Sequence, residues 1–134
     1  MEDVGRSWVL LLLSPRAAGG AERGIRAYVV LRLAADELQV MNLGVVPEHR
    51  RQGLARWLMG FALELGARRG ARRALLEVRR SNQPALALYA SLGFVPLGVR
   101  PGYYQSPRED AVVLLRPDLS RGDVGAHAPG TIDP

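Results

Sequence analysis

The stretch Met41–Leu65, MNLGVVPEHRRQGLARWLMGFALEL, decides how the fold of the whole chain is predicted. Residues 41–46 form an apolar run that contains a single glycine, and Pro47 follows it, which is typical of a strand and its end. From Gly53 onward, apolar residues recur at helical spacing and predict an amphipathic helix over Gly53–Arg68. The stretch is therefore interpreted as a strand, an arginine-rich turn and a helix.

The turn in this unit has the features of an anion site. It places free backbone N–H groups at a helix N-terminus, an end that carries about half a positive charge. Small residues at 53 and 55 leave room for a phosphate, and Arg50, Arg51 and Arg56 add guanidinium donors that suit phosphate oxygens. The sequence has neither the GxxxxGK[ST] phosphate loop nor the GxGxxG dinucleotide turn. Taken alone, the turn is explained equally well as a helix start with a basic surface.

Length and composition predict one soluble globular domain. The chain has 134 residues, of which 48% are hydrophobic and 23% charged. Without cysteine it has no disulfides or thiol chemistry, and its two histidines exclude a histidine-rich metal site, so no metal is expected. The apolar run 8–13 is too short for a membrane span or a signal peptide, so a cytoplasmic protein without an anchor is expected. Residues 1–116 are expected to form the domain, and 117–134, rich in turn formers, a disordered tail.

The charge of the chain has two explanations. The net charge is +5, and all 18 basic residues are arginine. Arginine binds phosphate and RNA, but a GC-rich genome also encodes basic positions as arginine, and the abundance of Ala, Gly, Leu and Pro favours this second explanation. Direct DNA binding is not expected.

The remaining segments predict a mixed α/β sheet. Strands over Ser7–Ser14, Ile25–Leu33 and Leu38–Val46 form an antiparallel meander, the first of them buried on both faces. After the helix, a strand over Ala71–Arg79 follows a right-handed crossover and lies parallel to the third strand. The chain continues with a helix over Pro84–Leu92, a strand over Phe94–Val99, a long loop over Arg100–Arg108 and a last strand over Asp110–Leu115.

Four motifs in chain order carry a resemblance to a known family. They are Arg50-x-x-Gly53-x-Ala55 after a strand, Leu76-Glu77-Val78-Arg79, Ser81-Asn82-x-x-Ala85-x-x-Leu88-Tyr89-x-x-x-Gly93-Phe94, and Tyr103-Tyr104 followed by Arg108-Glu109-Asp110-Ala111. Together they resemble the GCN5-related N-acetyltransferase (GNAT) family, in particular its branch that acetylates protein N-termini, including the N-terminal alanine of ribosomal protein S18. The resemblance covers residues 7–115. It implies the GNAT fold and direct transfer of an acetyl group from acetyl-CoA to a protein N-terminal amine.

The resemblance also implies roles for single residues. Glu77 matches the general base, although its flanking apolar residues fit a solvent-facing strand position just as well. Tyr89 matches the general acid, whereas its commoner role on such a helix is that of a core aromatic residue. Asn82 matches a contact to CoA and also suits a helix cap. Tyr103 and Tyr104 match the loop that covers the acceptor peptide, or a plain surface turn.

The implied acetyl-CoA site comprises a strand and the turn that follows it. In the family, the strand backbone pairs with the pantetheine arm and the turn holds the pyrophosphate. The residues implied here are Leu43, Gly44, Val45, Arg50, Arg51, Gln52, Gly53, Leu54, Ala55, Arg56 and Asn82.

One departure from the family concerns the N-terminus. The relatives begin with a strand and two helices that form one wall of the peptide groove, whereas this chain begins almost at the meander. A start codon assigned too late, a wall supplied by a second subunit, and a protein that no longer acetylates each explain this difference. Two other functions therefore stay open, a small-amine acetyltransferase of the same superfamily and a non-catalytic acyl-CoA-binding module.

Overall fold

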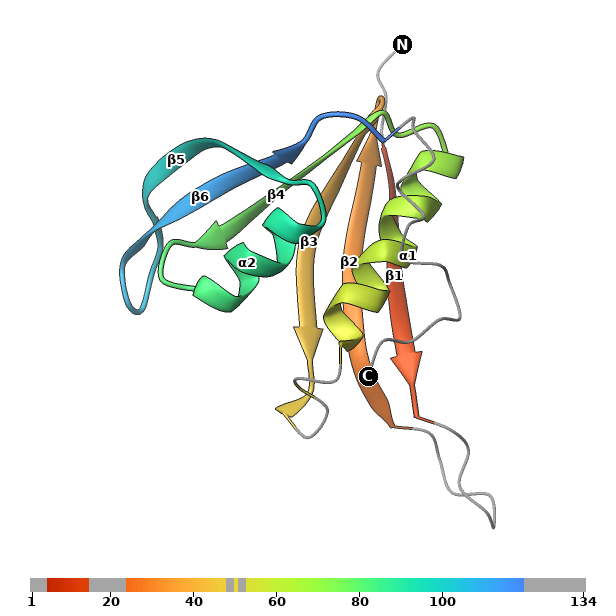
Figure 1. Ribbon diagram of the computed structural model, residues 1–134, viewed down its shortest axis with the longest axis horizontal. Coiled ribbons are helices and arrows are strands. Elements are labelled where there is room, and N and C mark those ends of the chain that lie inside the picture. The colour runs from red at the N-terminus through yellow and green to blue at the C-terminus, as the bar shows by residue number, and fades with distance from the viewer. Residues whose placement is uncertain (1–4, 15–23, 48–49, 51–52, 120–134) are drawn as a thin grey trace.

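The computed structural model describes residues 5–14, 24–47, 50 and 53–119 (Figure 1). Within this part the chain forms a six-stranded sheet with two helices packed on the same face. The elements are β1 (Arg6–Leu13), β2 (Ile25–Ala34), β3 (Glu37–Val45), α1 (Leu54–Arg68), β4 (Arg73–Arg79), α2 (Gln83–Ser91), β5 (Val95–Tyr104) and β6 (Glu109–Arg116). No helix in these ranges is long and apolar enough to cross a membrane.

The sheet is mixed, as the sequence predicts. Its strand order is β1-β2-β3-β4-β6-β5. The first three strands pair antiparallel as a meander, and β3 pairs parallel with β4 across the α1 crossover. The predicted α/β class and both strand arrangements are therefore confirmed.

The sheet splits between its two central strands. β3 and β4 pair only where Glu37–Val40 lies beside Arg73–Leu76, and beyond this point they diverge (Figure 1). From there β3 stays with β2, while β4 continues with β6. A β-bulge at Met41 coincides with the split, because Leu31 pairs with Val40 but Val30 pairs with Asn42.

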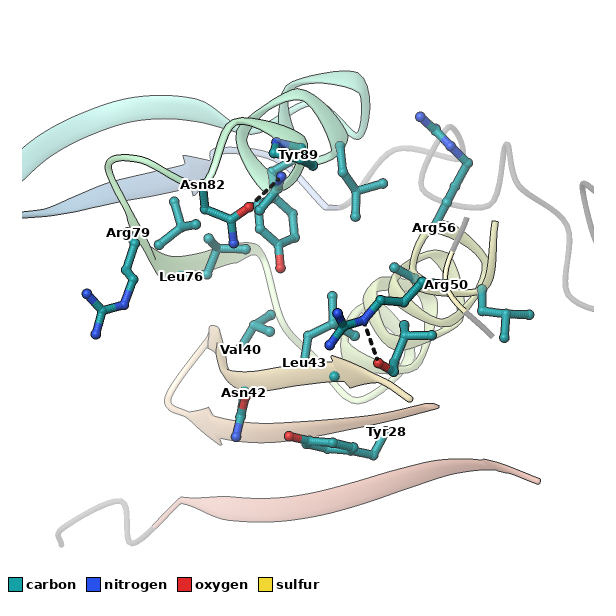
Figure 2. A pocket seen from close by; sticks show the side chains of 18 of the residues that line it. Tyr28, Val40, Asn42, Leu43, Arg50, Arg56, Leu76, Arg79, Asn82 and Tyr89 are labelled. Carbon is teal, nitrogen blue, oxygen red and sulfur yellow. Dashed lines mark hydrogen bonds between the residues drawn. The ribbon is translucent and has the colours of Figure 1, made fainter. Parts of the chain in front are cut away.

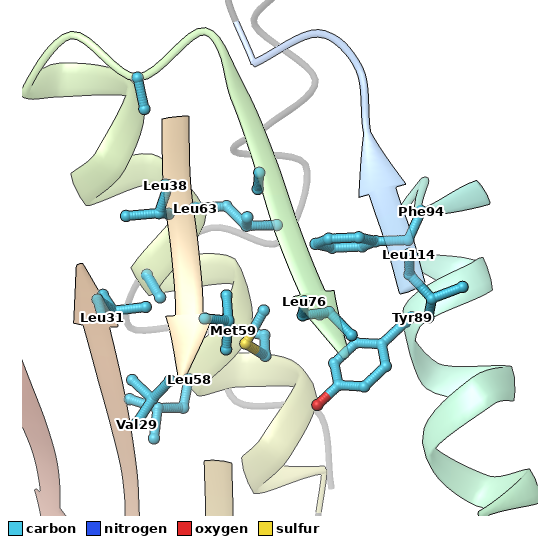
Figure 3. Packing of buried hydrophobic residues seen from close by; sticks show 14 of the residues in the cluster. Val29, Leu31, Leu38, Leu58, Met59, Leu63, Leu76, Tyr89, Phe94 and Leu114 are labelled. Carbon is cyan, nitrogen blue, oxygen red and sulfur yellow. The ribbon is translucent and has the colours of Figure 1, made fainter. Parts of the chain in front are cut away.

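The core lies between the sheet and the two helices (Figure 3). The period-2 pattern of β2 turns alternate residues, Val29 and Leu31 among them, toward α1, where they are fully buried. From α1, the buried side chains of Leu58, Met59 and Leu63 pack onto β2 and β3 (Figure 3). Burying one such side chain stabilises the fold by about 1.5–3 kcal/mol. These contacts hold the start of α1 at the open end of β3.

The first strand differs from its prediction of burial on both faces. β1 is an edge strand of a sheet whose helices, in the described part, cover one face only. Trp8 and Leu10 therefore pack against the core, whereas Val9 and Leu11 on the other face are 60% and 50% exposed. A continuous apolar run does not distinguish this arrangement from a doubly buried strand.

The loop predicted over Arg100–Arg108 is also shorter than expected. β5 continues to Tyr104, because pairing with β6 extends from Arg100 opposite Ala111 to Tyr104 opposite Glu109, with a register irregularity between. Tyr103 and Tyr104 therefore lie in a strand rather than a loop. The other predicted elements differ from the observed ones by one or two residues at their ends.

The packed domain reaches beyond its expected end at residue 116. Leu119 is 1% exposed and belongs to the core, and its N–H donates to the Arg72 carbonyl oxygen at 2.8 Å. The rest of the expected tail lies outside the described residues.

Candidate active site

The opening between β3 and β4 is a cleft (Figure 2). Strand alternation assigns its lining residues to the two faces of the sheet. Leu76 and Val78 belong to the face that carries the helices, where both are buried. Glu77 and Arg79, which alternate with them, belong to the opposite face. The cleft therefore passes through the sheet and joins its two faces.

The N-terminus of α1 borders this cleft. Gly53, the N-cap, has φ of 73° in the left-handed region that favours glycine. Among the described residues no side chain caps the helix, and its first turn contains no acidic residue. Gly53, Leu54, Ala55 and Arg56 all line the cleft, so the positive end of the helix faces this space.

Two arginines of the predicted turn lie at the same end of the cleft. Arg50 lines it and donates through Nε to the Val45 carbonyl oxygen at 3.2 Å (Figure 2). The Arg56 guanidinium donates to Ser91 Oγ on α2, so it joins the two helices across the cleft. Arg51 and Gln52, which the resemblance also implies, lie outside the described residues. Arg50 and Arg56 thus both line the cleft near the start of α1, with the Arg56 guanidinium directed toward α2.

The edge of β3 forms one wall of the cleft. Leu43, Gly44 and Val45 line it, beyond the last described pair between β3 and β4. Gly44 is required here by its neighbour on β2: a Cβ at this position would lie 2.4 Å from Cε1 of the Tyr28 ring. Tyr28 also lines the cleft. The strand glycine therefore marks a close approach of an aromatic ring, while the bulge lies at Met41.

Tyr89 is at the centre of the cleft and is buried with 7% exposure. Its ring packs edge-on against Phe94 at 5.7 Å between centroids, and its hydroxyl points into the cleft (Figures 2 and 3). Burial, and secondarily the charge of Tyr104, raise the pKa of Tyr89 to about 12. The phenol is therefore protonated at neutral pH and can donate a hydrogen bond or a proton. Its ring is a core residue and its hydroxyl is available to a ligand.

Glu77 lines the cleft from the opposite face with 27% side-chain exposure. Its Oε2 pairs with Nε of Arg100 on β5 at 3.0 Å. Its charge also reaches Tyr104: burial raises the pKa of Tyr104, and Glu77 is the second cause. The carboxylate thus lies between a cation and a phenol at the mouth of the cleft.

Of the three remaining predicted residues, Asn82 and Tyr104 line the cleft and Tyr103 does not. Asn82 caps α2 by accepting from the Ala85 N–H at 3.2 Å, and it also lines the cleft (Figure 2). Tyr104 lines the cleft, whereas Tyr103 is 46% exposed and lies outside its lining. The two rings contact each other edge-on at 5.1 Å between centroids, and only the Tyr104 ring reaches the cleft.

The cleft brings together groups of several chemical kinds. In the described ranges no group of three or more His, Cys, Asp or Glu side chains could hold a metal ion. The cleft instead combines a positive helix end, an unpaired strand edge, a protonated phenol and a carboxylate.

Comparison with known proteins assigns this arrangement to a family. The family model described as "Acetyltransferase (GNAT) family" matches residues 5–94, more than half of the chain. The chain belongs to the GNAT acetyltransferase family. The match contains the β3–turn–α1 unit, Glu77 and Tyr89.

One curated relative and one solved structure name the same E. coli enzyme. The [ribosomal protein bS18]-alanine N-acetyltransferase of Escherichia coli (strain K12) is 39% identical over 93 residues, which cover 68% of this chain and 63% of the relative. The crystal structure of the ribosomal-protein-S18-alanine N-acetyltransferase from E. coli superposes with a TM-score of 0.69 at 35% identity, over 80% of this chain and 68% of that chain. The chain thus spans less than two thirds of the length of the curated relative.

A more distant solved structure shows the same GNAT fold with ligands bound. The NatC complex bound to Gag peptide and CoA matches with a TM-score of 0.71 at 21% identity, over 81% of this chain and 70% of that chain. At this identity the likeness concerns the fold alone.

The sequence alone indicated no role for three residues in or beside the cleft, which are Tyr28, Arg79 and Arg100. Arg79 stood inside a quoted motif, and Arg100 fell in the predicted loop. Tyr28 had one indirect signal, because a glycine inside a strand indicates that something approaches its backbone closely. The partner of that glycine follows only from the register of β2 and β3.

Proposed function

We propose that the chain transfers the acetyl group of acetyl-CoA to the α-amine of a protein N-terminus, as a cytoplasmic enzyme, with the N-terminal alanine of ribosomal protein S18 as its acceptor. The observation that carries this proposal is the cleft through the split sheet. It joins the positive end of α1 on one face to Glu77 and Tyr104 on the other, with the Tyr89 hydroxyl between them. The name of the E. coli relative, a [ribosomal protein bS18]-alanine N-acetyltransferase, supports the choice of acceptor.

Acetyl-CoA fits the helix-bearing side of the cleft. Its pyrophosphate would accept hydrogen bonds from the first N–H groups of α1, with Arg50 and Arg56 adding charge. Its amide-containing arm would pair with the open edge of β3 like an added strand. Asn82 would contact the same arm from α2. The turn residues Arg51 and Gln52 complete the proposed set.

The acceptor amine would enter from the face of Glu77. A peptide α-amine has a pKa of about 7.7–8.0, so part of it must lose a proton before it attacks the thioester carbonyl. Glu77 accepts this proton, directly or through a water. As the carbon–sulfur bond breaks, the Tyr89 hydroxyl donates its proton to the leaving thiolate. The attacking nitrogen then loses its second proton, which returns to the Tyr89 phenolate through water. The products are an acetylated N-terminus and free CoA.

The test is acetyl transfer to a short peptide beginning Ala-Arg, followed by mass spectrometry. We expect one acetyl group on the α-amine, and none when the same peptide carries a blocked N-terminus. Transfer to small amines but not to the peptide would favour a small-molecule acetyltransferase. Acetyl-CoA binding without transfer to either acceptor would identify a non-catalytic binding module.

A pair of substitutions at Gly53 tests the proposed anion site at the N-terminus of α1. We expect Gly53→Asp to weaken acetyl-CoA binding about 2- to 30-fold relative to Gly53→Asn, because a carboxylate would oppose the pyrophosphate and helix-end charges contribute about 0.3–2 kcal/mol. Asn and Asp tolerate the left-handed φ of this position similarly, so the pair isolates the charge. Calorimetry measures the affinities, and thermal unfolding shows that both variants fold. Equal affinities would remove the pyrophosphate from this helix end.

A further inference from the structure

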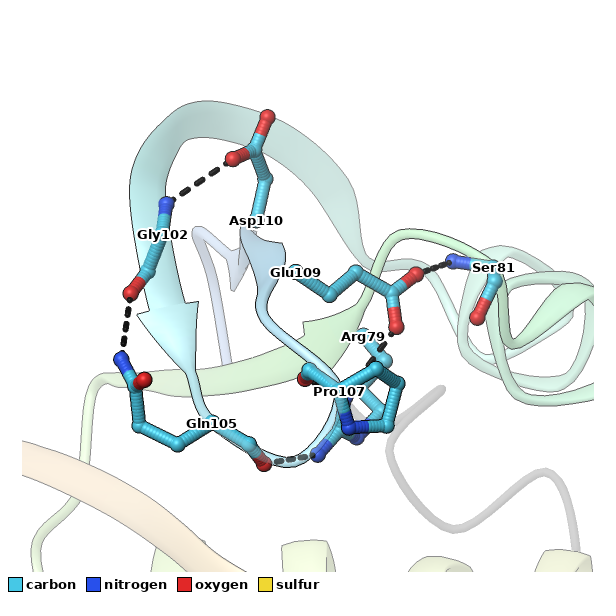
Figure 4. A network of polar contacts seen from close by, with 7 residues as sticks. All are labelled: Arg79, Ser81, Gly102, Gln105, Pro107, Glu109 and Asp110. Atoms are coloured by element: carbon cyan, nitrogen blue, oxygen red, sulfur yellow. Dashed lines mark hydrogen bonds and ion pairs between the residues drawn. The ribbon is translucent and has the colours of Figure 1, made fainter.

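Arg79, at the end of β4, connects the cleft to the hairpin turn between β5 and β6 (Figure 4). Its NH1 donates to the Pro107 carbonyl oxygen at 3.1 Å and its NH2 donates to the Gln105 carbonyl oxygen at 3.2 Å. NH1 also lies 3.2 Å from Oε1 of Glu109. One guanidinium therefore binds two carbonyls of the turn and a carboxylate just after it.

The same guanidinium lies on the ring of Tyr104. Its Cζ is 4.5 Å from the ring centroid, within the distance of a cation–π contact. Arg79 and Tyr104 both line the cleft, on the face where Glu77 lies. Arg79 thus contacts both the hairpin turn and a ring that lines the cleft.

Glu109 extends this connection to the start of α2. Its Oε2 accepts a hydrogen bond from the Ser81 N–H at 2.6 Å, and Ser81 directly precedes the α2 cap Asn82. Hydrogen bonding to Ser81, and then to Arg79, holds the pKa of Glu109 below its ordinary value. Glu109 is therefore ionised at neutral pH, and its pair with Arg79 persists there. The hairpin, β4 and α2 are held as one unit.

We propose that Arg79 is a positioning residue that holds Tyr104 at the acceptor end of the cleft and so sets the affinity for the acceptor peptide rather than for acetyl-CoA. The inference rests on the proposed function, because it assigns the Tyr104 side of the cleft to the acceptor. Arg79 acts through Tyr104 and does not take part in proton transfer.

Arg80 provides the matched control. It is the next residue in the chain, is exposed, and pairs with Asp110 at 3.3 Å near the same hairpin, but it does not line the cleft. Replacing either arginine by Met removes one guanidinium and retains a long apolar side chain. Only the Arg79 change removes the contact with the Tyr104 ring.

The first experiment compares steady-state kinetics with the Ala-Arg peptide. We expect Arg79→Met to raise the KM for the peptide about tenfold, with kcat within about threefold and acetyl-CoA affinity within about twofold of wild type. Arg79→Lys keeps a cation for the ring but loses the planar fork, so it should restore part of the peptide KM. Arg80→Met should leave all three quantities within about twofold. An unchanged peptide KM in Arg79→Met, or an equal loss of acetyl-CoA affinity, would overturn the inference.

A double-mutant cycle tests whether Arg79 acts through Tyr104. In a Tyr104→Ala background, Arg79→Met should add less than about twofold to the peptide KM, because the ring that it positions is gone. If the two effects add in full, Arg79 acts by another route and the inference fails.

A third measurement separates this inference from the proposed function. Peptide affinity in the presence of CoA requires no turnover, and Arg79→Met should weaken it about tenfold. Hydrogen exchange should accelerate over residues 100–109 and stay unchanged in β2 and β3. A wild-type chain that binds the peptide without acetylating it would contradict the proposed function alone. Unchanged peptide affinity in Arg79→Met would contradict the positioning role alone.

Discussion

Replacing Tyr89 by Phe is expected to lower the rate of acetyl transfer about 10²–10⁴-fold while leaving the fold and the affinity for acetyl-CoA unchanged. The range is that of a lost acid–base group. The ring of Tyr89 packs against Phe94 and contributes to the core, and Phe retains this packing. Only the hydroxyl that points into the cleft is lost (Figure 2). Steady-state kinetics with the Ala-Arg peptide, with calorimetry for acetyl-CoA, measure the two quantities.

The expected pH dependence follows from the pKa of Tyr89. Because this pKa is raised to about 12, the phenol stays protonated over pH 6.5–9.5 and can donate throughout that range. The Tyr89→Phe loss should therefore be similar at each pH. Tyr103→Phe is the control, because Phe keeps the edge contact with the Tyr104 ring and only a hydroxyl outside the cleft lining is lost, so this variant should acetylate at nearly the normal rate. A near-normal rate for Tyr89→Phe would reduce Tyr89 to a core aromatic residue.

Local patterns in the sequence predicted most of the fold. Apolar runs, glycine stops and the helical period after Gly53 give the order of strands and helices, and the crossover rule gives the parallel pairing of β3 with β4. Local patterns gave the wrong boundary where pairing with another strand sets the end of an element. Pro101 and Gly102 favour a turn by their local chemistry, but pairing with β6 carries β5 on to Tyr104.

The candidate site was predictable where its residues lie in consecutive motifs. The spacing of residues indicates the β3–turn–α1 unit, and the family resemblance indicates Glu77, Asn82 and Tyr89, which all line the cleft. The contacts that arrange the site could not be predicted in this way. For example, Arg100 on the distant strand β5 pairs with Glu77 on β4. Such pairs depend on strand register, and one residue of register shift exchanges the faces.

Glu77→Gln is expected to lower the acetyl-transfer rate about 10²-fold at pH 6.5 and only about tenfold at pH 9.5. The estimate uses the usual contribution of a general base, 10²–10⁴-fold. Below the amine pKa of about 8, most of the acceptor is protonated and needs a proton acceptor. Above that pKa the amine arrives neutral, so the carboxylate matters less. Gln keeps the size of the side chain, and its amide oxygen can still accept from Arg100.

The control is Glu64→Gln, which removes a carboxylate of similar exposure that pairs with Arg68 on α1 and does not line the cleft. It should leave the rate unchanged at every pH. The assay is transfer to the Ala-Arg peptide at intervals from pH 6.5 to 9.5, quantified by mass spectrometry. A uniform loss in Glu77→Gln would mean that the carboxylate positions the acceptor without taking its proton. An unchanged rate would return Glu77 to a solvent-facing strand residue held by Arg100, and the proton would then have to leave through water or another group in the cleft.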